Sequence, residues 1–397
     1  MMYVAKSYLY KDEHKKLDAL VKKLNFEKSE WSEEILLSYA ISQIRRDMFS
    51  EAKVTLEKLL KYYVNLRLSG LYWAWVINNK LGVEIENREI VRQIEKQYGF
   101  TYYGLRIMSA EKGPDHLKKF LKTKHISVKK FSLNDEEVKK FLMYYSGDFK
   151  ELFSLYLNSV KDKMTPKELA LFAILLERFD SRLHAIKILE MAWEADDSLR
   201  VQPFFSISYP YPFEDKVKKA VKKLRHVNEP SVLSIARQES AFNPRAMSGS
   251  GARGLMQVIS LTGKEMARVL RLRSYRGSRS LFDPSINLKI GAKYLDRLLV
   301  SSKGYLPYAL ASYNAGPGNM YRWSSLRPGV QDLRKGSIHK DYTPMDELWV
   351  EELPWSETRF YVKAVLRNLG LYRLLLDQRG SFSCDFYWMC GQDGKKL

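Results

Sequence analysis

One carboxylate stands out in the sequence because it ends an apolar stripe. In the segment from Glu229 to Pro244, EPSVLSIARQESAFNP, the side chains of Val232, of Ile235 or Ala236, and of Glu239 recur at helical spacing. Burial and the negative carboxyl end of a helix both raise a carboxyl pKa, and general acid catalysis requires a carboxylic acid that stays protonated near neutral pH. On spacing alone, a helix cap or an ion pair with a neighbouring arginine is favoured over catalysis.

Three later segments have compositions typical of binding sites. The segment from Ser248 to Gln257, SGSGARGLMQ, holds three glycines that let backbone approach a ligand, and Gln257 has the donor and acceptor that a sugar requires. Tyr313 and Asn314 end a short helix before a glycine–proline turn, and Glu357 opens a long amphipathic helix. A hydrogen-bonded core tyrosine and a carboxylate that only favours its helix dipole remain alternatives for Tyr313 and Glu357.

Two helix starts lie between these segments. Thr262 and Glu265 have the spacing of a capping box, which predicts that a helix starts there. Asp283 before Pro284 predicts a second start, so Asp283 is better explained as an N-cap than as a second catalytic carboxylate. The predicted core face of that second helix consists of Ile286, Ile290 and Tyr294.

The first 200 residues or so are helical in pattern. Apolar residues recur at helical spacing over 36–44 and 52–60 on either side of a polar break, and over 169–175 and 185–192 on either side of another. The repeating unit of an α-solenoid is a pair of helices joined by a short polar turn. Because nothing alternates strongly enough to suggest a large sheet, the fold class predicted is all-α, with a solenoid-like N-terminal region.

A change in composition marks a domain boundary. Two prolines within 208–213 exclude a helix interior, a short basic helix is predicted over 216–225, and glycine, proline and asparagine become frequent from about residue 229. The predicted organisation is a helical domain at 1–205, a linker at 206–228, a second helical domain at 229–378 and a tail at 379–397.

Composition limits the function classes. The 397 residues are 45% hydrophobic, enough for a sizeable core, and no stretch approaches the roughly 20 apolar residues of a membrane-spanning helix. The net charge of +20 indicates an anionic partner: nucleic acid, an acidic membrane or an anionic polymer. The six histidines are scattered, so neither a metal nor another cofactor is expected. Cys384 and Cys390 are either a disulfide or two free thiols.

Five ordered segments carry a family resemblance. ARQESAFNP, GARGLMQ, FDPSINLKIGAKYL, SYNAGPGN and PWSETRFYV resemble the catalytic domain of the soluble lytic transglycosylases, in the goose-type-lysozyme-like superfamily, over residues 229–376. Upstream, residues 102–105 and the Tyr-Pro junction at 209–213 resemble, with low specificity, the superhelix and linker of the large soluble members. The resemblance implies an α-superhelical region followed by a lysozyme-like α-helical catalytic domain.

The resemblance also implies an activity. The family cleaves the β-1,4 bond between N-acetylmuramic acid and N-acetylglucosamine in peptidoglycan with one carboxylic acid, which Glu239 matches. This acid protonates the glycosidic oxygen and then, as carboxylate, takes the proton of the muramyl C6 hydroxyl as that hydroxyl attacks the anomeric carbon. The product is a 1,6-anhydromuramyl end, and neither water nor a second carboxylate is consumed.

The remaining site residues follow from the same resemblance. The matched substrate-binding positions are Ser248, Met256, Gln257, Tyr313, Asn314 and Glu357. The sequence departs from the family pattern in two places. Ser248-Gly249-Ser250-Gly251 stands where the family often has Ser-Pro-x-Gly, which suggests a more mobile loop, and Ile259-Ser260 stands where Met-Pro often follows the glutamine.

Location and partners complete the expectation. The implied partners are peptidoglycan glycan strands and other cell-wall enzymes, and the implied location is the periplasm or cell envelope. The first residues, MMYVAKSYLY, show no signal peptide, so export would need another route or a signal removed upstream. A muramidase that uses water on the same scaffold and a non-catalytic peptidoglycan-binding protein remain alternatives. No nucleic-acid-binding motif is evident, which disfavours a nucleic-acid partner.

Overall fold

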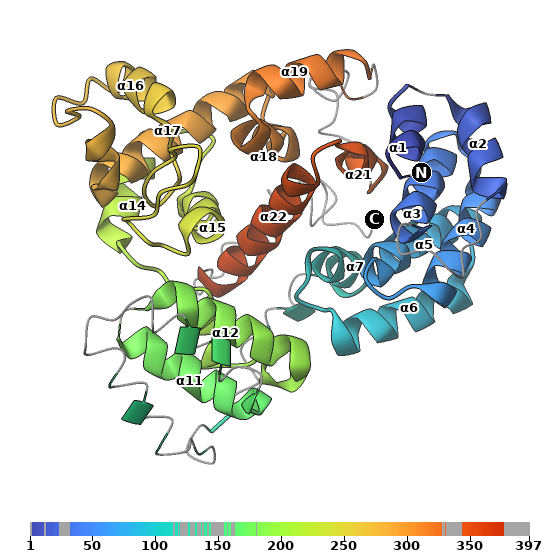
Figure 1. Ribbon diagram of the computed structural model, residues 1–397, viewed down its shortest axis with the longest axis horizontal. Helices are drawn as coiled ribbons and strands as arrows, with labels where there is room; N and C mark the ends of the chain where they lie inside the picture. Colours follow the sequence, from blue (N-terminus) through green and yellow to red (C-terminus); the bar gives the residue numbers. More distant parts are fainter. Residues whose placement is uncertain are drawn as a thin grey trace. The chain divides into compact units, whose positions relative to one another are not determined.

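The structure is a computed structural model, and it describes residues 2–11, 13–23, 32–113, 163–179, 181–327 and 344–376, with scattered residues between 116 and 159 and residue 330. Within these ranges the regular elements are helices, and the extended backbone is limited to two isolated bridges (Figure 1). The predicted all-α class is confirmed. None of the helices described combines the length and the apolar character that crossing a membrane requires. The predicted tail with Cys384 and Cys390 lies outside the described residues.

The chain forms two compact units, which interleave along the sequence. Unit 1 includes residues 1–117 and 297–370, and unit 2 includes residues 118–296 and 371–376. Two continuous helices, α17 (Pro284–Ser301) and α22 (Ser356–Leu376), contain crossings from one unit to the other. The domain boundaries inferred from sequence stay predictions.

The N-terminal part of unit 1 is a series of paired helices. They are α1 (Met2–Tyr10), α2 (His14–Lys22), α3 (Ser32–Arg45), α4 (Phe49–Tyr62), α5 (Arg67–Leu81), α6 (Glu84–Gln97) and α7 (Tyr102–Lys112). The pair predicted over 36–60 is α3 and α4, and it breaks where Asp47 takes a left-handed backbone. Helix α5 is buried continuously from Ser69 to Asn78, so the aromatic side chains of Tyr72, Trp73 and Trp75 belong to the core.

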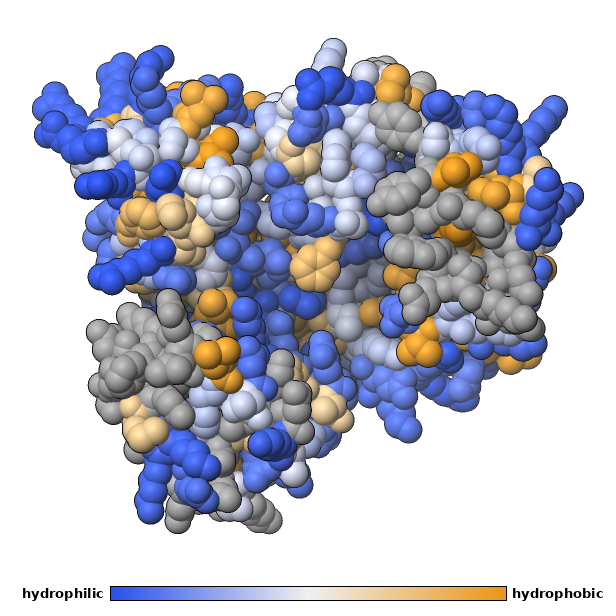
Figure 2. Space-filling view, in the orientation of Figure 1, coloured by the Kyte–Doolittle hydropathy of each residue, from blue (hydrophilic) through white to orange (hydrophobic). Residues whose placement is uncertain are grey.

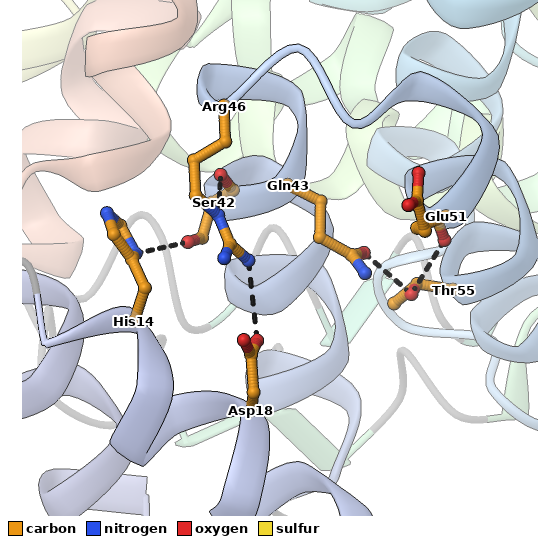
Figure 3. A network of polar contacts seen from close by, with 7 residues as sticks. All are labelled: His14, Asp18, Ser42, Gln43, Arg46, Glu51 and Thr55. Carbon is orange, nitrogen blue, oxygen red and sulfur yellow. Dashed lines mark hydrogen bonds and ion pairs between the residues drawn. The ribbon is translucent and has the colours of Figure 1, made fainter.

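Polar side chains of α3 join it to the helices on either side (Figure 3). The hydroxyl of Ser42 lies 3.1 Å from Nδ1 of His14 on α2, and the hydroxyl of Thr55 on α4 donates to Oε1 of Gln43 at 2.7 Å. Because consecutive residues of α3 reach opposite neighbours, specific polar contacts fix the order of these helices in addition to apolar packing.

The C-terminal part of unit 1 contains α18 (Leu306–Ala315), α19 (Pro317–Ser325), a 3-10 turn η6 (Pro344–Glu347) and α21 (Leu348–Glu352) before α22. Residues 344–352, here called the acidic segment, pack on the N-terminal helices. Nη1 of Arg106 lies 2.9 Å from Oε1 of Glu347, and both side chains are 3% exposed. The hydroxyl of Tyr102 also donates to Glu347, and burial raises the pKa of Tyr102 well above its usual range, so the hydroxyl remains a donor.

Two further carboxylates of the acidic segment are held in the same way. Glu351 accepts a hydrogen bond from Tyr103 and pairs with Lys363 at 2.7 Å. Burial alone would raise the pKa of Glu351, but the Lys363 ammonium, the Tyr103 hydrogen bond and the Arg359 charge together outweigh burial, and the pKa is lowered. Glu352 forms a two-bond ion pair with Arg45 of α3. The acidic segment is therefore tied to helices more than 200 residues earlier in the chain.

Unit 2 carries the second predicted helix pair and two of the predicted site segments, residues 229–244 and 248–257. Its elements are α11 (Pro166–Arg178), α12 (Arg182–Ala195), η3 (Asp197–Leu199), α13 (Phe204–Ser208), α14 (Glu214–Val221), α15 (Glu229–Ser240), α16 (Ser260–Val269), η4 (Ser278–Phe282) and the first part of α17. The pair predicted over 169–192 is α11 and α12. The Tyr-Pro stretch is non-helical between α13 and α14, as its prolines predict.

One predicted helix start is correct and one is wrong. Oδ1 of Asp283 accepts the N–H of Ile286 at 2.9 Å, so Asp283 caps α17 as expected. The capping box expected at Thr262 is wrong, because α16 already begins at Ser260. A bridge between Arg253 and Val258 keeps the preceding chain extended through Ile259, so the helix begins as soon as that bridge ends.

Candidate active site

The end of α15 presents Glu239. Oδ1 of Asn228 accepts the N–H of Ser231 at 3.1 Å and caps the helix start. Along the helix, Val232 and Ala236 are buried, and Glu239 is half-buried in the last turn. The chain therefore places this carboxylate where an apolar stripe reaches the surface, which is the position that its spacing predicts.

The backbone beside Glu239 is strained. Ala241 and Phe242 both have positive φ, at 45° and 64°, and Gln257 has a φ of 45°. Left-handed geometry at a residue other than glycine costs about 1–3 kcal/mol and concentrates at functional sites. The hydroxyl of Ser240 donates to the carbonyl of Leu255 at 2.8 Å, which joins the strained turn after Glu239 to the glycine-containing loop.

The loop from Ser248 to Gln257 is held by its own hydrogen bonds. Oγ of Ser248 accepts the N–H of Ala252 at 3.1 Å and lies 2.9 Å from the hydroxyl of Ser250. Nε2 of Gln257 donates to the carbonyls of Ala246 and Gly254, at 3.1 and 2.9 Å. The amide group of Gln257 thus uses its donors within the protein, and its oxygen is the atom suited to accept a hydrogen bond from a ligand.

Asn287 on α17 supports this loop, and sequence reasoning missed it. Its side chain is 1% exposed. Oδ1 accepts the N–H of Met256 at 2.8 Å, and Nδ2 donates to the carbonyls of Arg253 and Leu281, both at 2.8 Å. The available signal was a polar residue four positions before Gly291 on a helix whose neighbouring positions are apolar.

The side chain of Met256, which belongs to this loop, packs against α17. Its side chain is fully buried, and a Cβ on Gly291 of α17 would lie 2.5 Å from its sulfur. Gly254 is equally constrained, because it has a φ of 73° and a Cβ there would lie 2.2 Å from the carbonyl oxygen of Leu281. The predicted contact between Met256 and substrate stays a prediction, while its packing against α17 is a structural observation.

Replacing Asn287 by alanine should destabilise unit 2. The substitution leaves an N–H and two carbonyls without their partner, and each unsatisfied buried group costs about 1–3 kcal/mol. We expect a loss of about 3 kcal/mol in the free energy of unfolding, measured by urea denaturation. Asn319→Ala is the control, because Asn319 is exposed and its side-chain hydrogen bonds, to the carbonyl of Ala315 and from Arg322, both lie at the surface. Equal losses in both variants would contradict the role given to Asn287.

Arg237 holds the opposite side of the turn that carries Glu239. Arg237 and Glu239 are two positions apart on the helix, which separates their directions around the helix axis by about 200°, so the two side chains point in nearly opposite directions. The Arg237 guanidinium donates from Nε to the carbonyl of Ser208 at 2.7 Å and from Nη2 to Glu190 at 2.8 Å, and it lies 4.2 Å from the ring centroid of Tyr209. A buried arginine thus anchors α15 to α12 and the α13 junction.

The other three predicted site residues belong to unit 1. Tyr313 and Asn314 are half-buried in the last turn of α18, and Glu357 is exposed in the first turn of α22. The buried Thr358 donates to Oδ1 of Asn314 at 2.7 Å and so joins these two helix ends. Sequence reasoning missed Thr358. Glu239, Ser248, Met256 and Gln257 belong to unit 2, so each unit holds one group of predicted residues.

Comparison with protein families and curated proteins identifies relatives of this chain. Residues 216–332 match the family model for the transglycosylase SLT domain. The soluble lytic murein transglycosylase of Salmonella typhimurium is 34% identical over 164 residues, which are 41% of this chain and 23% of that protein. That of Escherichia coli K12 is 27% identical over 321 residues, 80% of this chain and 45% of that protein. The chain spans less than half the length of these relatives.

Solved structures share the fold. One is an inactive glutamate-to-glutamine mutant of the lytic transglycosylase Slt from Pseudomonas aeruginosa. The match covers 94% of this chain and 56% of the Pseudomonas chain, with a TM-score of 0.70 and 22% identity. The 70-kDa soluble lytic transglycosylase of Escherichia coli matches 89% of this chain and 55% of its own, with a TM-score of 0.61 and 21% identity. The resemblance stated from the sequence and the predicted fold class are confirmed.

Proposed function

We propose that this chain, whose residues 216–332 match a transglycosylase SLT domain, is a lytic transglycosylase that cleaves peptidoglycan between N-acetylmuramic acid and N-acetylglucosamine. The observation that carries the proposal is the half-buried Glu239 at the end of α15, within the matched segment. The names of the relatives, soluble and membrane-bound lytic murein transglycosylases, support the substrate class.

Glu239 acts as the single general acid and base. Its carboxylic acid gives a proton to the glycosidic oxygen as the bond to the anomeric carbon breaks, which releases the N-acetylglucosamine end. The resulting carboxylate takes the proton of the muramyl C6 hydroxyl while that oxygen bonds to the anomeric carbon. The second step restores the acid and forms the 1,6-anhydro ring, so no water is consumed. Asp283 caps α17, consistent with a mechanism that needs no second carboxylate.

The other predicted residues position the sugar for this intramolecular attack. Oε1 of Gln257 accepts from an acetamido N–H or a hydroxyl, and the half-exposed hydroxyl of Ser248 contacts the reacting muramyl unit. The buried side chain of Met256 supports the loop by packing on α17. Tyr313, Asn314 and Glu357 provide polar contacts to the glycan, with Asn314 oriented by Thr358. Correct positioning is worth a large part of the barrier when the nucleophile belongs to the substrate itself.

The chain works in the cell envelope on glycan strands. A net charge of +20 favours a wall whose stem peptides and surrounding polymers are anionic, and it raises the local concentration of the enzyme there. The name of one group of relatives, membrane-bound lytic murein transglycosylase C, is compatible with this location.

Product analysis tests the proposed reaction. Purified sacculi digested by the full chain should release muropeptides with 1,6-anhydromuramyl ends, seen by mass spectrometry. Reducing ends heavier by one water would show that the chain is a muramidase on the same scaffold. Binding to sacculi without release of any fragment would show a non-catalytic peptidoglycan-binding protein.

A further inference from the structure

The strongest unassigned surface of unit 2 is a cluster of basic side chains, here called the basic hairpin. It comprises residues 260–282: helix α16, the turn after it and η4. Its exposed basic residues are Lys264, Arg268, Arg271, Arg273, Arg276 and Arg279, and its one acidic residue is Glu265. None of the contacts described above that hold Glu239 or the loop from Ser248 to Gln257 uses these six basic side chains.

The turn of the hairpin folds back onto α16, so these side chains share one small structural element. Gly263 leaves room for Tyr275 and Leu281, because a Cβ there would lie 3.1 Å from the Tyr275 hydroxyl and 3.2 Å from Leu281. The N–H of Leu272 donates to the carbonyl of Ala267 at 2.9 Å after Arg271 takes a left-handed backbone. The turn is therefore packed on the helix.

The basic groups of the hairpin are available to a partner. Across the part of the chain that is described, no ion pair involves the side chain of Lys264 or of the five arginines of the hairpin. Elsewhere in the molecule, arginines such as Arg106 and Arg237 are buried and bonded to carboxylates. The hairpin thus differs from the structural arginines of the same protein, whose charge is neutralised internally.

Large apolar side chains are exposed among these cations. Leu261 and Val269 of α16 are 75% and 55% exposed, and Ile259 just before the helix is 45% exposed. In the region of α16, Figure 2 shows apolar side chains beside strongly hydrophilic ones. A soluble polyanion would satisfy only the charges, whereas the headgroup region of a bilayer takes both cations and apolar side chains.

We propose that the basic hairpin docks on the surface of an anionic phospholipid bilayer. The arginines and Lys264 contact lipid phosphates, while Leu261, Val269 and Ile259 enter the boundary between headgroups and acyl chains. Because Ser260 Oγ accepts from Arg253 at 2.9 Å, the hairpin is joined directly to the loop that ends in Gln257. Docking would therefore hold that loop close to a membrane surface, which goes beyond the proposed cleavage activity.

Vesicle binding by the full chain tests the docking. Flotation assays with vesicles of phosphatidylcholine plus phosphatidylglycerol should recover the protein, and vesicles of phosphatidylcholine alone should not. Each basic residue near an anionic surface contributes about a fivefold factor in affinity, so the triple variant Arg268→Ala, Arg273→Ala, Arg276→Ala should bind about a hundredfold more weakly. The matched control is Lys58→Ala, Lys80→Ala, Lys96→Ala, which removes the same charge from exposed positions of unit 1. The control should bind like the wild type.

Equal weakening by both triple variants would overturn the proposal, because net charge alone would then explain binding. A second variant, Leu261→Ser with Val269→Ser, separates a bilayer from a soluble polyanion. It should lose vesicle binding and keep binding to inorganic polyphosphate; unchanged vesicle binding would overturn the bilayer as partner. Glu239→Gln should bind vesicles like the wild type, because docking does not use the proposed catalytic acid. Vesicle binding therefore tests the docking surface separately from the proposed reaction.

Discussion

Replacing Glu239 by glutamine should abolish release of anhydromuropeptides while leaving the fold and the binding of sacculi intact. Glutamine keeps the shape of the side chain but has no carboxyl proton to give to the glycosidic oxygen. General acid–base catalysis is worth about 10²–10⁴ in rate, and this residue supplies both the acid and the base. We expect turnover to fall by at least about 10³ with little change in KM, measured as soluble muropeptides released per unit time.

The control for this variant is Glu194→Gln. Glu194 lies on α12 in the same unit, is exposed, and loses the same charge with the same change of shape. Its activity should equal that of the wild type. If Glu239→Gln keeps its activity, another group is the acid and the mechanism proposed above is wrong. If the wild type binds sacculi but releases no muropeptides, the chain is not catalytic and the proposed reaction is wrong.

Replacing Arg106 by methionine should cost more stability than most single substitutions in this chain. The guanidinium is buried and pairs with Glu347, while its Nε also donates to the hydroxyl of Tyr72 at 3.1 Å. Removing one partner of a buried ion pair leaves the other charge uncompensated, at a cost of about 3–5 kcal/mol. Urea unfolding followed by tryptophan fluorescence measures the loss, and hydrogen exchange of the α5 and α7 amides locates it.

An exposed ion pair is the matched comparison. Arg92 and Glu89 are 3.3 Å apart and each is 75% exposed, so Arg92→Met should cost less than about 1 kcal/mol. The double variant Arg106→Met with Glu347→Leu should lose less than the sum of the two single losses, because no buried charge is then left alone. Arg106→Met behaving like Arg92→Met would show that the pair contributes little.

The helices of this protein could be predicted largely from its sequence, because apolar spacing and local caps depend on neighbouring residues. The pairs α3–α4 and α11–α12 follow the expected stripes, and Asp283 with Pro284 marks the start of α17. The failure at Thr262 has a non-local cause. Its capping-box spacing is correct, but pairing between Arg253 and Val258 decides where the preceding extended chain ends.

The supports of the site could not be predicted, because their partners are distant in sequence. Asn287 holds a loop more than 30 residues earlier, Thr358 contacts Asn314 across 44 residues, and Arg237 bonds to Glu190 across 47. A sequence without aligned relatives contains no signal for such pairs. Glu239 itself could be selected only because five motifs resemble one family; its apolar stripe alone favours an ordinary structural role.

The acidic segment bears on how this protein can be divided into pieces. Glu347, Glu351 and Glu352 lie within the stretch that sequence reasoning assigns to the catalytic domain, yet Arg106, Tyr103 and Arg45 that neutralise or bond them come from the first 112 residues. A fragment beginning near residue 216 would leave Glu347 and Glu352 without the arginines that pair with them, and Glu351 would keep Lys363 but lose the hydrogen bond from Tyr103. We therefore expect that the stretch assigned to the catalytic domain does not fold alone, and that transferring it to another protein would require the N-terminal helices or the replacement of Glu347 and Glu352 by neutral residues.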